Sequence, residues 1–172
     1  PQRTSVDAGK IEVLEFFWYA CPHCYSLHPL IETWAEKLPE DVVFRHVHVS
    51  FRSPSHQQIH YTLEAMGKDK ALGIKVFEAI HRERKRMRDE GEIKAWAEAN
   101  GLDGQEFMKF FSSFGVRTQM KRASQATTAF GVDGVPMLAI NGKYLTSPSM
   151  TGSNAAALSM ADTLIEMERK AA

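Results

Sequence analysis

The sequence predicts an α/β fold that is interrupted by an all-helical insertion. The first observation is an apolar run at 11–18, rich in branched and aromatic residues, which is typical of a strand buried on both faces. Apolar residues then recur at helical spacing over 25–38, before a second strand-like run at 42–51. The second observation is that the pattern between 53 and 113 is helical throughout. Strand, helix and strand in this order predict a βαβ unit, with the helical region following it.

The remaining elements are indicated by local signals. The helical pattern continues over 116–130 and stops at a glycine-containing loop. A β-hairpin is predicted over 137–145, because the pair Asn141-Gly142 at its centre is typical of a primed turn. Ser153 is suited to cap a last helix. These signals complete an α/β domain around the helical insertion.

The predicted organisation is one discontinuous α/β domain, residues 1–52 and 116–172, with a helical insertion domain over 53–115. A chain of 172 residues, of which 44% are hydrophobic, can bury a core of its own without disulfide staples. No dimerisation segment is visible in the sequence, so we expect a monomer.

The composition argues against some classes of partner. The formal net charge is zero and the pI is about 7.5, so neither nucleic acid nor an anionic membrane is indicated. The dense charge run at 81–90 mixes both signs at helical spacing and predicts a solvated helix face. No stretch reaches the ~18 apolar residues of a membrane span, and no charged-then-apolar leader opens the chain. Because the chain begins at Pro1, we interpret it as a mature form without signal peptide, which permits export.

The strongest functional signal is the motif Cys21-Pro22-His23-Cys24, which contains the only two cysteines of the sequence. It directly follows the first predicted strand and directly precedes the first helical pattern. One helical turn brings both sulfurs together, so the pair can cycle between dithiol and disulfide. Pro22 fits the first helical position, where its missing N–H costs nothing. The motif therefore predicts a thiol–disulfide redox site at the carboxyl end of a strand.

The positions of the two cysteines predict different roles. Cys21 would lie over unsatisfied N–H groups at the positive end of the helix dipole, which favours a thiolate, so we expect it to be the nucleophile. Cys24, a turn further in and more buried, is the expected resolving thiol. His23 can stabilise the Cys21 anion further, as an imidazolium or an N–H donor. Stabilising the thiolate favours the reduced protein, and this predicts an oxidant.

Three segments together resemble the DsbA family. They are EFFWYACPHCY at 15–25, HVSF at 48–51 and GVPMLAINGKY at 134–144, in the family's order and rough spacing. The resemblance implies a thioredoxin fold interrupted by a helical domain. It also implies an enzyme of the bacterial periplasm that donates its disulfide to unfolded or newly exported polypeptides with cysteines. A membrane quinone-linked partner of the DsbB type would reoxidise it, and no cofactor beyond the Cys21–Cys24 disulfide is implied.

The resemblance also assigns residues around the dithiol. Val135-Pro136 should form a cis peptide next to Cys21, and the Val135 backbone should pair with an extended peptide substrate. The best-known members have an acid and a lysine near the site, where this chain has His28 and His46. Both histidines can change charge near neutrality, which bears on the strength of the oxidant. We place His28 among the substrate-binding residues.

Several of these residues allow a plainer interpretation. Glu15, in an otherwise apolar strand, is expected to accept or relay the proton of Cys24 through water, but it could be an edge residue that points to water. His46 could be a functional charged residue or a half-exposed strand residue, and for His48 we expect only the latter. Met150 could line an apolar substrate groove.

Other functions stay open on the sequence alone. A reductase or isomerase of the same fold would carry the same motif, and its reduction potential would distinguish it from an oxidase. A non-enzymatic zinc- or peptide-binding module is the alternative outside enzymes. A closed structural zinc site requires four protein ligands. Because the sequence has no second cysteine pair to supply them, we expect no bound metal.

Overall fold

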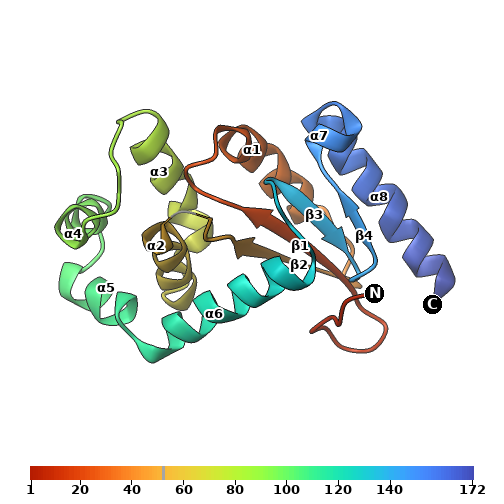
Figure 1. The fold of residues 1–172 in the computed structure, drawn as a ribbon, viewed down its shortest axis with the longest axis horizontal. Coiled ribbons are helices and arrows are strands. Elements are labelled where there is room, and N and C mark those ends of the chain that lie inside the picture. The colour runs from red at the N-terminus through yellow and green to blue at the C-terminus, as the bar shows by residue number, and fades with distance from the viewer. Residues whose placement is uncertain (52) are drawn as a thin grey trace. The chain divides into compact units, whose positions relative to one another are not determined.

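The computed structural model describes residues 1–51 and 53–172 (Figure 1). The strand–helix–strand unit, the helical region and the hairpin follow one another in the predicted order. In chain order the elements are β1 (Ile11–Phe17), α1 (Pro22–Glu36), β2 (Val42–His48), α2 (Pro54–Ala65), α3 (Asp69–His81), α4 (Glu90–Ala99), α5 (Gly104–Phe111), α6 (Phe114–Ala129), β3 (Met137–Ile140), β4 (Tyr144–Thr146), α7 (Pro148–Thr151) and α8 (Asn154–Ala171).

The strands of the described residues form one sheet in the order β2-β1-β3-β4. β3 runs antiparallel to both of its neighbours, and Val13 lies opposite Ile140 in the register with β1. The hairpin turn has the predicted primed character, because Asn141 and Gly142 have left-handed φ angles of 52° and 70°. Lys143 donates its N–H to the Ile140 carbonyl and closes the turn, so the second strand of the hairpin starts at Tyr144.

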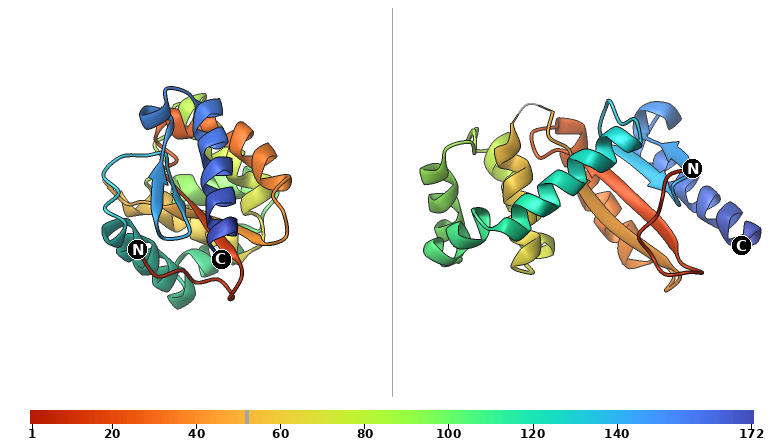
Figure 2. Two further views of the ribbon diagram at one scale, coloured as in Figure 1. Left: turned by 90° about the vertical axis from the view of Figure 1, so that its right-hand side faces the viewer. Right: turned by 60° about the horizontal axis from the view of Figure 1, so that its bottom comes forward.

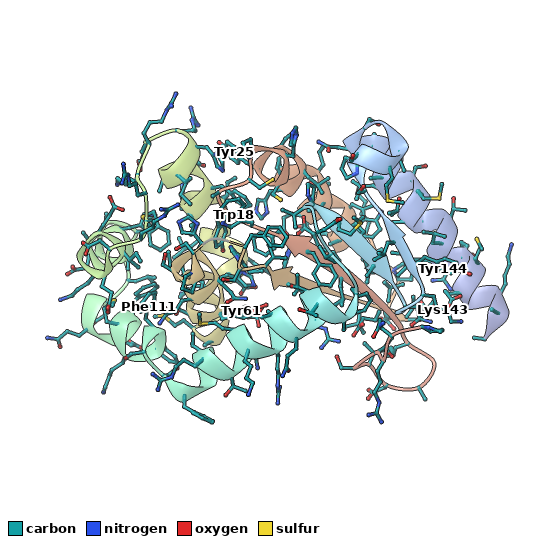
Figure 3. All side chains as sticks on the ribbon, viewed as in Figure 1. Trp18, Tyr25, Tyr61, Phe111, Lys143 and Tyr144 are labelled. Carbon is teal, nitrogen blue, oxygen red and sulfur yellow. The ribbon has the colours of Figure 1, made fainter. Side chains whose placement is uncertain are left out.

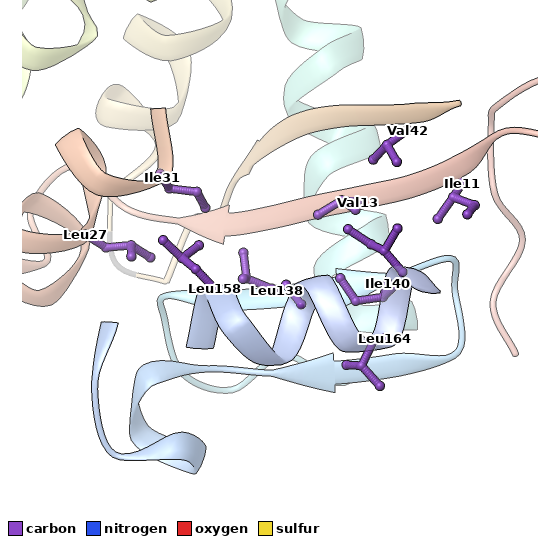
Figure 4. Packing of buried hydrophobic residues seen from close by; sticks show 11 residues of the cluster. Ile11, Val13, Leu27, Ile31, Val42, Leu138, Ile140, Leu158 and Leu164 are labelled. Carbon is purple, nitrogen blue, oxygen red and sulfur yellow. The ribbon is translucent and has the colours of Figure 1, made fainter. Parts of the chain in front are cut away.

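Two helices, α1 and α8, pack on one face of this sheet (Figure 4). α8 lies against β1, β3 and β4 (Figure 2). On the other face Phe16 packs against Phe130, with ring centroids 5.4 Å apart, so β1 is buried on both sides as its sequence predicts. The core between the sheet and the two helices contains Ile11, Val13, Leu27, Ile31, Val42, Leu138, Ile140, Leu158, Ala161, Leu164 and Ile165.

By their contacts the residues fall into two compact units. The first, which we call the sheet unit, comprises 1–17, 26–47 and 126–172, and the second, the helical unit, comprises 18–25 and 48–125. The helical unit therefore includes the cysteine motif as well as the inserted helices. The predicted domain boundaries stay a prediction, and the one at residue 52 lies outside the described residues.

The helical unit is held by packing of α2 against α3 and α5, and of α4 against α5. Asp103 caps α5 by accepting the N–H of Glu106 at 3.0 Å. The buried apolar side chains of the helical unit include Ile59, Leu63, Val76, Phe77, Ile93, Trp96, Phe107 and Phe111.

The charge run at 81–90 is not the helix that its spacing predicts. α3 ends at His81, and the chain is extended or bent until α4 begins at Glu90. The physical reason is Met87, which is the apolar residue of the run: it is fully buried, and its N–H donates to the Glu92 carboxylate. Anchoring this one side chain holds the segment as an ordered loop with Arg84 in a left-handed conformation.

α1 carries a proline in its interior. Pro29 has no N–H, so the hydrogen bond that residue 29 would donate to the carbonyl of Tyr25 in a regular helix is not made. Thr33 Oγ1 donates to the Pro29 carbonyl at 3.0 Å. The boundary between the helical unit and the sheet unit also lies within α1, between Tyr25 and Ser26.

In residues 1–51 and 53–172, no helix combines the length and the apolar character that crossing a membrane requires.

Candidate active site: the Cys21–Cys24 dithiol

The cysteine motif opens α1, as the position of Pro22 predicts. The Cys21 N–H donates to the Trp18 carbonyl at 3.0 Å, and the Cys21 carbonyl accepts the Tyr25 N–H at 3.1 Å, the first bond of the helix. Cys21 is 8% exposed and Cys24 only 1% exposed, in the dithiol form. Cys21 thus lies at the helix N-terminus, and Cys24 is buried one turn inside.

The surroundings of Cys21 favour its thiolate. The hydrogen bond from the Cys24 thiol is the largest effect and lowers the pKa of Cys21 to about 6. Burial acts in the opposite direction, but the backbone N–H groups of Cys24 and His23 and the His23 imidazole add to the lowering of this pKa. A thiol with a pKa of about 6 is mostly ionised at pH 7, which makes it a nucleophile and a good leaving group.

Both flanks of the motif are held by aromatic side chains of the helical unit. Figure 3 labels Trp18 and Tyr25, which lie on the two sides of the motif in the sequence. The Tyr25 ring stacks on His81 and Phe77, with centroids 5.0 Å and 5.7 Å away. On the other flank, the carbonyl of the buried Tyr19 accepts a hydrogen bond from His81 Nε2 at 2.7 Å.

His48 corrects an expectation drawn from the strand pattern. It is fully buried and not half-exposed, because Tyr61 and Gln57 of α2 enclose it: the Tyr61 hydroxyl accepts the His48 N–H at 3.2 Å, and the Gln57 amide donates to the His48 carbonyl at 2.9 Å. Its ring Nε2 lies 3.2 Å from the Tyr19 N–H. The HVSF segment therefore belongs to the structure that holds the motif.

A second group of polar residues lies in the sheet unit, around His46. Its Nδ1 is 2.6 Å from Glu15 and its Nε2 is 2.8 Å from Glu32. Glu15 is only 2% exposed, so the reading of it as an edge residue pointing to water is wrong. Burial alone would lower the pKa of His46, but the hydrogen bonds to both carboxylates outweigh it and raise this pKa to about 10. His46 is therefore an imidazolium at neutral pH.

The other predicted site residues belong to the sheet unit as well. His28 is half-buried, and its ring centroid lies 6.5 Å from that of His46. The Val135–Pro136 peptide bond is cis, as the resemblance implies, with Pro136 buried and Val135 half-buried. Met150 in α7 is 64% exposed. Their roles stay predictions, as does the part assigned to Glu15 in proton transfer.

Sequence reasoning missed several residues that surround these two groups. Glu32 on α1 and His60 on α2 lie in no segment that the sequence singled out, and Tyr19 and His81 lie in quoted segments but were given no role. One usable signal was present: His60 lies between Ile59 and Leu63 on the predicted α2. A polar residue beside an apolar stripe is buried only if it finds a partner, and that partner comes from another element.

Among residues 1–51 and 53–172, no three side chains of the metal-ligating types gather in an arrangement that could hold a metal ion.

Known proteins share this sequence and fold. The family described as DSBA-like thioredoxin domain matches residues 12–158. The thiol:disulfide interchange protein DsbA of Bordetella parapertussis is 45% identical over 173 residues, which cover 99% of this chain and 82% of that protein. DsbA of Pseudomonas aeruginosa PAO1 is 42% identical, over 95% of this chain and 79% of that protein.

Solved structures agree with these relatives. The crystal structure of Pseudomonas aeruginosa DsbA matches with a TM-score of 0.95 at 40% identity, and covers 99% of this chain and 90% of that one. NmDsbA1 from Neisseria meningitidis matches with a TM-score of 0.82 at 26% identity, over 99% and 89% of the two chains. The predicted thioredoxin fold with helical insertion is thereby confirmed, and this chain belongs to the DsbA family of thiol:disulfide oxidoreductases.

Proposed function

We propose that this enzyme is a dithiol oxidase that donates the Cys21–Cys24 disulfide to newly exported polypeptides. The observation that carries the proposal is the pair of unequal thiols at the start of α1. Cys21 has its pKa lowered to about 6, and Cys24 is buried one turn further along. This asymmetry gives one sulfur that leaves readily as an anion and one that stays protected.

The exchange proceeds in two balanced steps. A substrate thiolate attacks the Cys21 sulfur of the disulfide, the Cys21–Cys24 bond breaks, and Cys24 leaves and takes up a proton. A second substrate thiolate then attacks the substrate sulfur of the mixed disulfide, and Cys21 leaves as a thiolate. The substrate loses two electrons to the protein, which ends as the dithiol. The low pKa of Cys21 assists this second step, because a thiol of lower pKa is the better leaving group.

The same asymmetry sets the direction of the reaction. Each pKa unit by which Cys21 lies below ambient pH stabilises the reduced protein by roughly 1.4 kcal/mol, or about 30 mV for a two-electron couple. With a pKa of about 6, the thiolate therefore makes the protein a stronger oxidant at pH 7 than a dithiol with an unshifted Cys21. A reductase of the same fold would have a more negative reduction potential.

The surrounding residues complete the proposed mechanism. Glu15 would accept or relay the Cys24 proton, and its buried carboxylate supports this role. The backbone of Val135, before the cis Pro136, would pair with an extended substrate. His28 and the exposed Met150 would contribute to binding, since methionine surfaces adapt to varied partners.

The proposed setting is the bacterial periplasm. The named relatives are thiol:disulfide interchange proteins of bacteria, and the family resemblance supports a membrane quinone-linked reoxidase of the DsbB type as the second partner. The protein would act as a monomer, without nucleic acid, metal or an organic cofactor.

The test is the redox equilibrium of the Cys21/Cys24 pair against glutathione buffers, followed by Trp fluorescence. We expect a potential near the oxidising end of the known range, at about −120 mV, a value known for a DsbA and not obtained from this chain. A potential near about −270 mV would make the protein a reductase. Cys21→Ser should abolish oxidation of a dithiol peptide. Cys24→Ser should also fail to oxidise it, but when this variant is given a peptide disulfide, the Cys21 thiolate should attack that disulfide, release one peptide thiol and accumulate as the mixed disulfide. Tight stoichiometric zinc in the reduced protein would favour a metal-binding module.

A further inference from the structure

Tyr19 is bound at each of its polar groups by a different histidine of the helical unit. Its N–H donates to His48 Nε2 at 3.2 Å, its carbonyl accepts from His81 Nε2 at 2.7 Å, and its hydroxyl lies 3.4 Å from His60 Nδ1. Tyr19 is 1% exposed and lies two residues before Cys21. We call these three side chains, His48, His60 and His81, the histidine clamp.

The three histidines come from three separate elements. His48 ends β2, His60 lies in the middle of α2, and His81 is the last residue of α3. Tyr19 is thereby bound to three separate elements, so a displacement of any of them would also displace Tyr19. A buried backbone N–H and C=O need partners at any residue, and here both partners are histidine side chains of other elements.

The hydrogen bonds of His48 determine its tautomer. Nδ1 lies 2.7 Å from the Val49 carbonyl, which can only accept, so this nitrogen carries the proton. Nε2 must then be unprotonated in order to accept the Tyr19 N–H. The neutral ring fits its buried surroundings, where the pKa of His48 is lowered chiefly by burial and further by the charge of His60. The acceptor that holds Tyr19 is therefore fixed in place and in protonation state.

His81 contacts both flanks of the cysteine motif. Its Nε2 donates to the carbonyl of Tyr19 before the motif, and its ring stacks on Tyr25 after the motif, with centroids 5.0 Å apart and an interplanar angle of 8°. Phe77, one turn earlier on α3, stacks on the same Tyr25 ring. One imidazole thus sets the spacing between the chain that enters the motif and the helix turn that leaves it.

From this arrangement we infer that the histidine clamp positions the cysteine motif for disulfide exchange, with His81 as its principal member. The inference rests on the function proposed above for Cys21. The thiolate is stabilised by the Cys24 thiol and by the N–H groups of His23 and Cys24, and hydrogen bonds of this kind weaken steeply when their angles change. The clamp acts through Tyr19 and Tyr25 on that geometry and does not touch the sulfurs in these contacts. Its members are positioning residues.

The test separates the two contacts of His81. His81→Phe keeps an aromatic ring to stack on Tyr25 but removes the donor to Tyr19, and His81→Gln keeps a donor but removes the stacked ring. Tyr19→Phe removes the hydroxyl that contacts His60 and keeps the backbone contacts with His48 and His81, so it is the mildest change. Phe107→Leu is the control, because Phe107 is buried in the same unit but far along the chain from the motif. Two quantities are measured for each reduced, folded variant: the titration of the Cys21 thiolate by absorbance at 240 nm, and the equilibrium constant with glutathione.

We expect His81→Phe to raise the midpoint of the thiolate titration by about 0.5–1 unit and to shift the glutathione equilibrium roughly three- to tenfold toward the oxidised protein. Tyr19→Phe should shift both quantities in the same direction by less, and Phe107→Leu should lower the stability without shifting either. The inference is overturned if His81→Phe and Tyr19→Phe behave like Phe107→Leu. A wild-type protein whose Cys21 titrates near 9 would instead overturn the proposed function, so the two failures are distinguishable.

Discussion

His46 and His48 lie two residues apart on β2, yet the structure holds them in opposite protonation states. His46, in the sheet unit, bridges two carboxylates, which raise its pKa to about 10. His48, in the helical unit, is surrounded by a backbone N–H, a carbonyl and other histidines, and its pKa lies well below the ordinary value. The same residue type thus provides a cation in one unit and a neutral acceptor in the other. The partners, and not burial alone, decide which.

The largest expected effect is the loss of the cation in the sheet unit. His46→Leu leaves the buried Glu15 without its partner, and breaking a buried ion pair on one side typically costs about 3–5 kcal/mol. We expect a loss of this size in the free energy of unfolding, measured with urea. The double variant Glu15→Leu/His46→Leu is the matched control and should recover most of it, since no buried charge is left. If His46→Leu alone were as stable as the wild type, the assignment of a charged His46 would be wrong.

The two histidines also predict opposite pH limits of stability. The folded pKa of His46, about 10, is above its ordinary value of 6.5, so its contribution is complete below pH ~6.5 and is lost as pH rises toward 10. The folded pKa of His48 is below 6.5, so the unfolded chain binds a proton that the folded chain does not, and stability is lost as pH falls below ~6.5. His56 has the same sign as His48. Each proton changes the stability by at most about 1.4 kcal/mol per pH unit.

These limits are measured by urea unfolding between pH 5 and 10 on the oxidised protein, in which Cys21 does not titrate. His46→Lys keeps a cation to higher pH. The loss of stability above pH ~6.5, the alkaline limb, should therefore be less steep in this variant, while the loss of stability below pH ~6.5, the acid limb, should be unchanged. An alkaline limb of the same steepness in His46→Lys and the wild type would contradict the assignment to His46.

A smaller effect is expected from removing the neutral acceptor in the helical unit. His48→Leu leaves the buried Tyr19 N–H without the His48 ring, and a buried donor that loses its partner costs about 1–3 kcal/mol. The free energy of unfolding should fall by this amount, and the acid limb should become shallower. His48→Asn is the milder comparison, because its amide offers an acceptor without titrating. A full acid limb in both variants would assign it to other groups.

The smallest expected effect is on the support of His48. Tyr61→Phe removes the hydroxyl that accepts the His48 N–H at 3.2 Å, and we expect a cost of about 1 kcal/mol. The pH at which the acid limb begins should not change, because the hydrogen bond that is removed is to the backbone N–H of His48. A shift of that pH in Tyr61→Phe would mean that the hydroxyl also affects the imidazole.

What the sequence predicted well is what local chemistry determines. Pro22 marks the start of α1, Asn141-Gly142 marks the hairpin turn, and the position of Cys21 at a helix N-terminus predicts the direction of its pKa shift. The family resemblance, and with it the fold, rests on the same short segments and is confirmed by the relatives. Each of these signals needs only a few neighbouring residues.

What the sequence did not predict depends on elements distant in the chain. His48 is buried because α2 supplies Tyr61 and Gln57, and His46 is charged because Glu15 and Glu32 lie on two other elements. The loop over 82–88 likewise replaces a helix because one methionine finds a place in the core. The spacing of residues along the sequence does not show which distant elements come into contact. It therefore did not predict the burial of His48, the charge of His46 or the loop over 82–88.

Pro29 gives α1 an uneven stiffness. The bond that its missing N–H removes is the one that would tie the Tyr25 carbonyl to the next turn, directly behind the segment that carries the two sulfurs. The first turn of α1 is therefore joined to the following residues, among them the buried Leu27 and Ile31, by one backbone hydrogen bond fewer than in a regular helix. Forming and breaking a bond between Cys21 and Cys24 changes the separation of the two sulfurs. The opening turn of α1, which lacks this hydrogen bond, can absorb that change while Leu27 and Ile31 stay packed in the core.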